Sequence, residues 1–163
     1  MKTKYLLVTL GICAIILGTL GYRAQFQSSP AVPNNWITYI NTEYGFGLKR
    51  PQQYDISQRA GIKEYCNDTP FDEIVIKDTE GKDILVANNG KGCIGGFPST
   101  LISTEKLGNT VTKTVSLDKQ NDLDPSNDRR YATYSFGNFI SGPVYDSNLE
   151  MLFDQIFSTY KSI

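Results

Sequence analysis

Hydrophobic and polar residues alternate in the stretch NTEYGFGLKRP, residues 41–51. Side chains two positions apart lie on the same face of a β-strand, so the alternation predicts a strand over residues 44–48 with two unlike faces. A preceding strand is expected at residues 36–40. Pro51 ends the ladder, because proline has no N–H to donate. One face of the strand carries Tyr44, Phe46 and Leu48, and the other carries Gly45, Gly47 and Lys49.

Two hairpins and a further strand are predicted in the middle of the chain. In the first hairpin, Gly81 supplies the positive φ that a tight turn requires. The second hairpin turns at Leu-Gly-Asn, residues 107–109. Its second strand places Val111, Val115 and Leu117 on one face and threonines on the other. The expected strands cover residues 73–79, 83–89, 100–106, 110–118 and 129–137.

The C-terminal stretch SNLEMLFDQIFSTYKSI, residues 147–163, has the periodicity of an amphipathic helix. Ser147 and Glu150 have the spacing of a capping box, and Asp146 adds negative charge at the helix start. Lys161 suits the opposite end of the helix dipole. The apolar stripe must pack on a sheet, which predicts an α+β fold: an antiparallel sheet covered by this helix. The stripe consists of Leu149, Leu152, Phe153, Ile156 and Tyr160.

Residues 5–22, YLLVTLGICAIILGTLGY, contain no charged side chain. As a helix these 18 residues reach roughly 27 Å, close to the hydrocarbon thickness of a bilayer. Lys2 and Lys4 precede the run, so residues 1–4 are expected in the cytoplasm and the rest of the chain outside. The sequence therefore predicts an N-terminal transmembrane signal-anchor.

A cleaved signal peptide is the rival interpretation, with Thr19 and Gly21 as a weak small-residue pair. The uncleaved anchor is preferred, because the run is longer than a usual signal core. Cys13 is a poor site for lipid modification, since a bulky isoleucine precedes it. Residues 23–35 contain two prolines and two serines and indicate a linker, which leaves residues 36–163 as the extracytoplasmic domain.

Charge and composition exclude several classes of function. The chain has 16 Lys and Arg and 17 Asp and Glu, and Lys2, Lys4 and Arg23 flank the apolar segment. The rest therefore carries 13 cations and 17 anions, a net charge of −4, which disfavours nucleic-acid binding. The sequence has no histidine, which rules out Ser-His-Asp and Cys-His nucleophile systems and histidine-ligated zinc.

The two ends of the predicted domain resemble the PsbP-like family, which comprises the extrinsic P protein of photosystem II and many non-photosynthetic bacterial relatives. The resemblance rests on WITYINTEYGFGLKRP, residues 36–51, and on the terminal FDQIFSTYKSI, where Phe153, Ile156 and Phe157 match. Arg50 stands where an aromatic residue is usual, and Tyr54 where tryptophan is usual. The opening matches are Trp36, Tyr39, Asn41, Tyr44, Gly45, Phe46, Leu48 and Pro51.

This resemblance implies a PsbP-like α/β/α sandwich, in which helices pack against a central antiparallel sheet, often behind an N-terminal anchor. It implies little about activity, because the relatives share a fold without sharing one function. The metal-binding histidines of the photosynthetic members have no counterpart in this chain. The middle of the chain does not match the family.

Three stretches are candidates for a site. NNGKGCIGG, residues 88–96, lacks the spacing of a phosphate-binding loop and indicates an irregular glycine loop. DKQNDLDPSND, residues 118–128, offers carboxylates for Ca²⁺ but fails the EF-hand pattern, so a solvated turn is expected. Cys66 and Cys93 are the only cysteines outside the apolar segment and favour a disulfide in an oxidising compartment, with two unrelated thiols as the alternative. The acidic side chains of the second stretch are Asp118, Asp122, Asp124 and Asp128.

These patterns favour a non-enzymatic accessory or binding domain held at the membrane by one helix, with an unknown envelope protein or small ligand as its partner. No catalytic residue, metal site or cofactor is predicted. A structural or assembly subunit of an envelope complex is one alternative. An enzyme that uses carboxylates or lysine in a cleft is another, and converging Asp, Glu and Lys with strongly shifted pKa values would favour it.

The predicted bond between Cys66 and Cys93 closes a loop of 28 residues and stabilises the domain by about 3.6 kcal/mol in the chain-entropy model. Both cysteines lie in stretches rich in turn-forming residues that bury little surface alone. Thiol counting on the unfolded, non-reduced ectodomain is expected to find no reactive thiol. Two reactive thiols would contradict the pairing.

Overall fold

A computed structural model of the chain describes residues 32–61, 70–89, 99–118 and 128–163, all within one compact unit, Val32–Ile163. The predicted anchor, residues 5–22, lies outside the described residues, as do Cys66 and Cys93. In the ranges that are described, no helix has the length and hydrophobicity needed to cross a bilayer.

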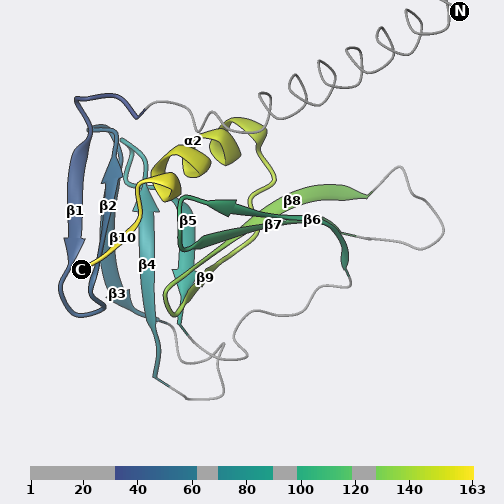
Figure 1. Cartoon of the computed structure of the whole chain (residues 1–163), viewed down its shortest axis with the longest axis horizontal. Coiled ribbons are helices and arrows are strands. Elements are labelled where there is room, and N and C mark those ends of the chain that lie inside the picture. The colour runs from purple at the N-terminus through teal and green to yellow at the C-terminus, as the bar shows by residue number, and fades with distance from the viewer. Residues whose placement is uncertain (1–31, 62–69, 90–98, 119–127) are drawn as a thin grey trace, which may run out of the picture. The chain divides into compact units, whose positions relative to one another are not determined.

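The strands form two antiparallel sheets where one was expected (Figure 1). The small sheet has the order β1-β2-β10 and comprises β1 (Ile37–Asn41), β2 (Phe46–Arg50) and β10 (Lys161–Ser162). The large sheet has the order β3-β4-β5-β9-β8-β7-β6 and comprises β3 (Asp55–Ala60), β4 (Asp72–Lys77), β5 (Asp83–Asn88), β6 (Ser99–Leu107), β7 (Val111–Asp118), β8 (Arg129–Phe136) and β9 (Phe139–Ser141).

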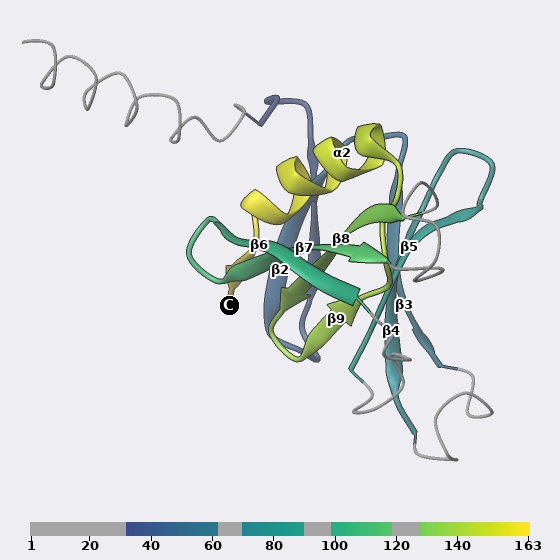
Figure 2. The same cartoon turned by 90° about the vertical axis from the view of Figure 1, so that its right-hand side faces the viewer.

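One C-terminal helix, α2 (Ser147–Ser158), accompanies these sheets in the described part of the chain and runs above β7 and β8 in Figure 2. The α+β class predicted from the sequence is therefore confirmed. Both predicted hairpins are confirmed as β4–β5 and β6–β7. Gly81 turns the first of them with a φ of +78°.

Three strands, β3, β9 and β10, escaped prediction, the first two for a local reason. In β3, DISQRA, Ile56 is the only buried residue, so the sequence has no apolar alternation to detect. β9 has three residues, fewer than a periodic pattern needs. Both strands are held by their neighbours: β3 pairs with β4, and β9 lies between β5 and β8.

The strand predicted at residues 44–48 begins two residues later, at Phe46. Gly45 has a φ of +66°, which places it in the left-handed region and breaks the extended backbone. Tyr44 therefore lies in the turn, where its N–H donates to Asn41 Oδ1 at 2.9 Å. Its ring meets Phe139 of β9 edge-on at 4.9 Å, so the turn residue links the small sheet to the large one.

The limits of the C-terminal helix also differ from the prediction. Asp146 is the N-cap, and its carboxylate accepts from the N–H groups of residues 148 and 149, so the capping box of Ser147 and Glu150 is wrong. The helix ends at Ser158. Thr159 then donates its hydroxyl to the Ile156 carbonyl at 2.6 Å and accepts the N–H of Lys49 at 2.7 Å. Lys161 therefore lies beyond the helix, in β10, where it pairs with Gly47 of β2.

An aromatic cluster fills the core where the two sheets and the helix meet. Phe136 of β8 lies 6.0 Å from Phe46 of β2 and 4.8 Å from Phe157 of α2 between ring centroids. Tyr160 stacks on Phe46 at 5.6 Å and 20°. The most deeply buried aromatic side chains are Phe46, Tyr134, Phe136, Phe139, Phe153 and Phe157.

Candidate functional site

Two features could form a site: a network of charged side chains between α2 and the sheet, buried at Lys113 and Glu150, and a groove on the outer face of the small sheet. The network centres on Lys113 of β7, whose side chain is 7% exposed. Its Nζ lies 2.7 Å from Glu150 Oε1 and 2.5 Å from Asp154 Oδ2, both on α2. Arg130 of β8 makes a two-pronged contact with Glu150, and the Tyr134 hydroxyl donates to Asp154 Oδ1 at 2.8 Å.

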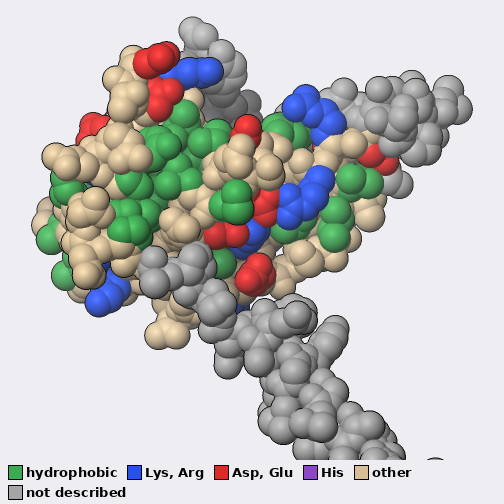
Figure 3. All heavy atoms as spheres, turned by 90° about the horizontal axis from the view of Figure 1, so that it is seen from above, with side chains coloured by type: hydrophobic (Ala, Val, Ile, Leu, Met, Phe, Trp, Pro, Cys, Tyr) green, Lys and Arg blue, Asp and Glu red, His purple; other side chains and the backbone are tan. Residues whose placement is uncertain are grey.

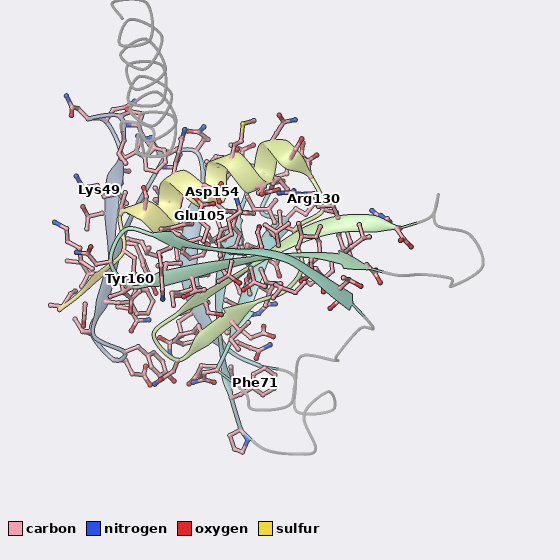
Figure 4. The ribbon with its side chains drawn as sticks, turned by 45° about the vertical axis from the view of Figure 1, so that its right-hand side comes forward. Lys49, Phe71, Glu105, Arg130, Asp154 and Tyr160 are labelled. Atoms are coloured by element: carbon pink, nitrogen blue, oxygen red, sulfur yellow. The ribbon has the colours of Figure 1, made fainter. Side chains whose placement is uncertain are left out.

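The register of the sheet explains this meeting. Lys113 lies directly opposite Tyr134 on β8 and opposite Glu105 on β6. Glu150 and Asp154 are four residues apart, so they lie on one face of the helix above the sheet. In Figure 4, Asp154 is labelled on α2 and Arg130 next to the end of that helix that follows β8. Acidic and basic side chains adjoin each other across the middle of the surface seen from above (Figure 3).

The network shifts the pKa values of Glu150, Lys113 and Tyr134. The hydrogen bonds from Arg130 and, after them, the hydrogen bond and charge of Lys113 together lower the pKa of Glu150 to about 2 against the opposing effect of burial. Burial alone would lower the pKa of Lys113, but its hydrogen bonds to Asp154 and Glu150 outweigh burial and raise that pKa. Burial, together with the charge of Asp154, raises the pKa of Tyr134.

These shifts all move away from neutrality, whereas a general acid or base works best with a pKa near the operating pH. The network therefore suits a structural role, which is to fix the start of α2 on β7 and β8. The Lys113 ammonium also occupies the space between the two carboxylates where a cation would bind. Within the part of the chain that the structure describes, no group of three metal-ligating side chains is close enough to hold a metal ion.

The second feature is a groove of about 210 Å³ over Gly47 of β2. Gly47 has no side chain, and the Cβ of any larger residue there would lie 3.7 Å from Ile163 Cδ1. The groove is therefore a gap in the outer face of the small sheet. Residues of β1 bound it on one side and residues of the C-terminal strand on the other. Its walls are formed by Thr38, Ile40, Leu48, Lys49, Thr159, Lys161 and Ile163.

Exposed apolar side chains and cations adjoin in this groove. Ile40 is 58% exposed and Ile163 is 73% exposed. Lys49 and Lys161 make no ion pair with any described residue, whereas Lys113 and Arg130 are each paired. Figure 4 places Lys49 on the side of the small sheet that faces away from α2. The groove therefore combines apolar surface with positive charge, and no acidic side chain lines it.

The volume of the groove limits what can occupy it. Pockets that enclose drug-sized ligands measure about 300–1,000 Å³. At about 210 Å³ and open to solvent, this groove accommodates a few protruding side chains of a partner. A shallow apolar patch flanked by charge is typical of a contact with another macromolecule.

The residues that the sequence singled out lie elsewhere. Asp118 is buried at the end of β7, with its Oδ2 3.3 Å from the Tyr145 hydroxyl, and Asp128 lies next to β8. Asp122, Asp124 and most of the glycine-rich stretch lie outside the described residues. The solvated turn and the irregular glycine loop therefore stay predictions.

The sequence missed both features but contained a signal for each. Lys113 interrupts the apolar face that contains Val111 and Val115, and a lysine on a buried face requires an acidic partner. For the groove, the alternation correctly placed Gly47 and Lys49 on the face away from the core. What it could not show was that β10 returns to that face.

Comparison of the chain with protein-family models, with curated proteins and with solved structures gives no match.

We expect Glu150→Gln to destabilise the domain by about 3 kcal/mol at neutral pH, because the substitution breaks a buried ion pair. The pKa of Glu150 falls from 4.5 to about 2 on folding, so the carboxylate stabilises the fold above pH 4.5. This contribution is lost as the pH falls towards 2, so the difference between wild type and variant should shrink over that range.

Urea unfolding across this pH range measures the effect. Asp55→Asn is the matched control, because its partner Arg50 is 3.3 Å away and the Asp55 side chain is 63% exposed. It should cost less than about 1 kcal/mol. A difference between Glu150→Gln and wild type that stays constant with pH would contradict the ionised network.

Proposed function

We propose that this chain is a membrane-anchored, extracytoplasmic domain that binds a segment of an envelope protein through the groove on its small sheet. Residues 5–22 would be the single-pass anchor, residues 23–35 the linker and residues 36–163 the binding domain. The uncharged run preceded by Lys2 and Lys4 supports the anchor and its orientation.

The observation that carries the binding function is that exposed isoleucines adjoin lysines that make no ion pair with any described residue. Ile40 and Ile163 leave apolar surface in water, and contact with a partner would remove it. Lys49 and Lys161 lie beside them without an acidic neighbour among the groove residues. The proposed partner segment is therefore apolar and acidic.

A non-enzymatic role is part of the proposal. Converging carboxylates and lysine are present beneath α2, as the enzyme alternative requires, but the pKa shifts of Lys113 and Glu150 stabilise both in their ordinary charge states. Such a network supports a rigid scaffold that presents the groove. No cofactor enters the proposal.

Kinship with the PsbP-like family is proposed as well, together with the α/β/α sandwich that it implies. The residues that carried the resemblance support it by their positions. The N-terminal matches Phe46 and Leu48 are buried in the same core as the C-terminal matches Phe153, Ile156 and Phe157. They are therefore residues that a shared fold would retain.

Site-specific photocross-linking tests the binding function. A benzoylphenylalanine in place of Ile40 should give a defined adduct with an envelope protein in intact membranes, because its side chain lines the groove. The same group in place of Met151 on α2 should not, although both positions are 58% exposed. Mass spectrometry of the adduct should locate the link in an acidic, apolar segment.

Lys49→Glu, introduced together with the cross-linker at position 40, should abolish the adduct by reversing the charge at the groove. Equal adducts from positions 40 and 151, or no adduct from position 40, would contradict a binding role for the groove.

A further inference from the structure

The two sheets end in open strands that differ in charge. At the ends of the large sheet, β3 carries Asp55 and Arg59, and β6 carries Glu105 and Lys106. In the small sheet β10 carries Lys161. Natural proteins use such charges to keep sheet edges from pairing with other strands. Among the described edge strands, β1 (ITYIN) alone has no charged residue.

The open edge of β1 is also accessible. Ile37 is 42% exposed and Ile40 is 58% exposed. Among the described strands β1 pairs with β2 alone. In an antiparallel pair, alternate residues direct both the N–H and the C=O away from the partner strand. The edge therefore offers backbone donors and acceptors to an incoming strand.

We propose that β1 accepts an extended peptide as an additional strand, and that the adjoining groove selects a carboxylate and an apolar side chain two residues apart. This inference rests on the proposed binding function and names the chemistry of the partner. Two features of β1 support it. The strand has no charged residue, and its residues Thr38 and Ile40 also line the cationic, apolar groove.

The register of the small sheet gives the spacing of the motif. On the outer face Thr38 lies opposite Lys49, and Ile40 lies opposite Gly47. An added strand would place side chains two residues apart beside Thr38 and Ile40, because alternate side chains share a face. A carboxylate beside the short Thr38 can reach the Lys49 ammonium. An apolar side chain beside Ile40 can extend over it towards the gap at Gly47.

Charge complementarity favours this occupant over a second copy of the chain. Two β1 strands paired with each other would bring ITYIN against ITYIN, and neither strand offers a carboxylate to Lys49. An acidic peptide supplies a carboxylate for Lys49. Its side chains also suit the groove volume of about 210 Å³.

Binding of a synthetic peptide to the full chain in detergent micelles tests the inference. The probe is dye-labelled acetyl-Thr-Thr-Glu-Thr-Leu-Thr-Thr-amide, and fluorescence anisotropy measures its affinity. Replacing its glutamate with lysine should weaken binding about tenfold, and raising the ionic strength should remove most of that difference. N-methylation of alternate backbone amides should abolish binding, since it blocks strand pairing and keeps the side chains.

Variants of the chain locate the site. Lys49→Glu and Ile40→Glu should each weaken binding about tenfold, whereas Met151→Glu, equally exposed to Ile40, should leave the affinity unchanged. Thermal unfolding checks that all three variants fold.

The possible outcomes distinguish a failure of the strand-addition inference from a failure of the proposed binding function. Equal binding of the N-methylated peptide would overturn strand addition. A cross-link at position 40 without peptide binding would leave the groove as a binding site and overturn the proposed motif. Peptide-independent dimers that Ile40→Glu disrupts would show that a second copy occupies β1, and would also overturn it.

Discussion

The aromatic packing around Phe46 and Phe136 is the contact on which the other features depend. It joins β2 of the small sheet to β8 of the large sheet, and α2 closes over it through Phe157. Tyr160 must reach Phe46 to complete the cluster, so the chain has to leave the helix just before it. The two residues of β10 then pair with β2 and build one wall of the groove.

The charged side chains beneath α2 differ from those at the groove in their ion pairing. Beneath α2 each charge has a partner: Lys113 is shared by two carboxylates, and Arg130 holds Glu150. Such pairing fixes the position of α2 on β7 and β8. At the groove Lys49 and Lys161 make no ion pair with a described residue and lie next to exposed isoleucine. The first arrangement supports the scaffold, and the second supports recognition.

Short-range patterns in the sequence correctly predicted the elements that neighbouring residues determine. Gly81 marked a hairpin turn, and the apolar spacing from Leu149 to Ile156 marked the helix. Features decided by distant contacts were missed. Thr159 ends the helix through its bond to Lys49, a partner 110 residues away. Lys113 on an apolar face indicated a need for an acidic partner, but the sequence did not identify that partner, because Glu150 and Asp154 lie on a helix more than 35 residues further along the chain.

Backbone amide hydrogen exchange along β1 tests the central claim most directly, which is that the edge of the small sheet receives the partner. The full chain is compared with and without the acidic peptide. Alternate residues of Ile37–Asn41 should exchange rapidly in the unbound protein and become protected in the complex, while β6 stays unchanged. Saturating peptide with unaltered exchange in β1 would contradict the account.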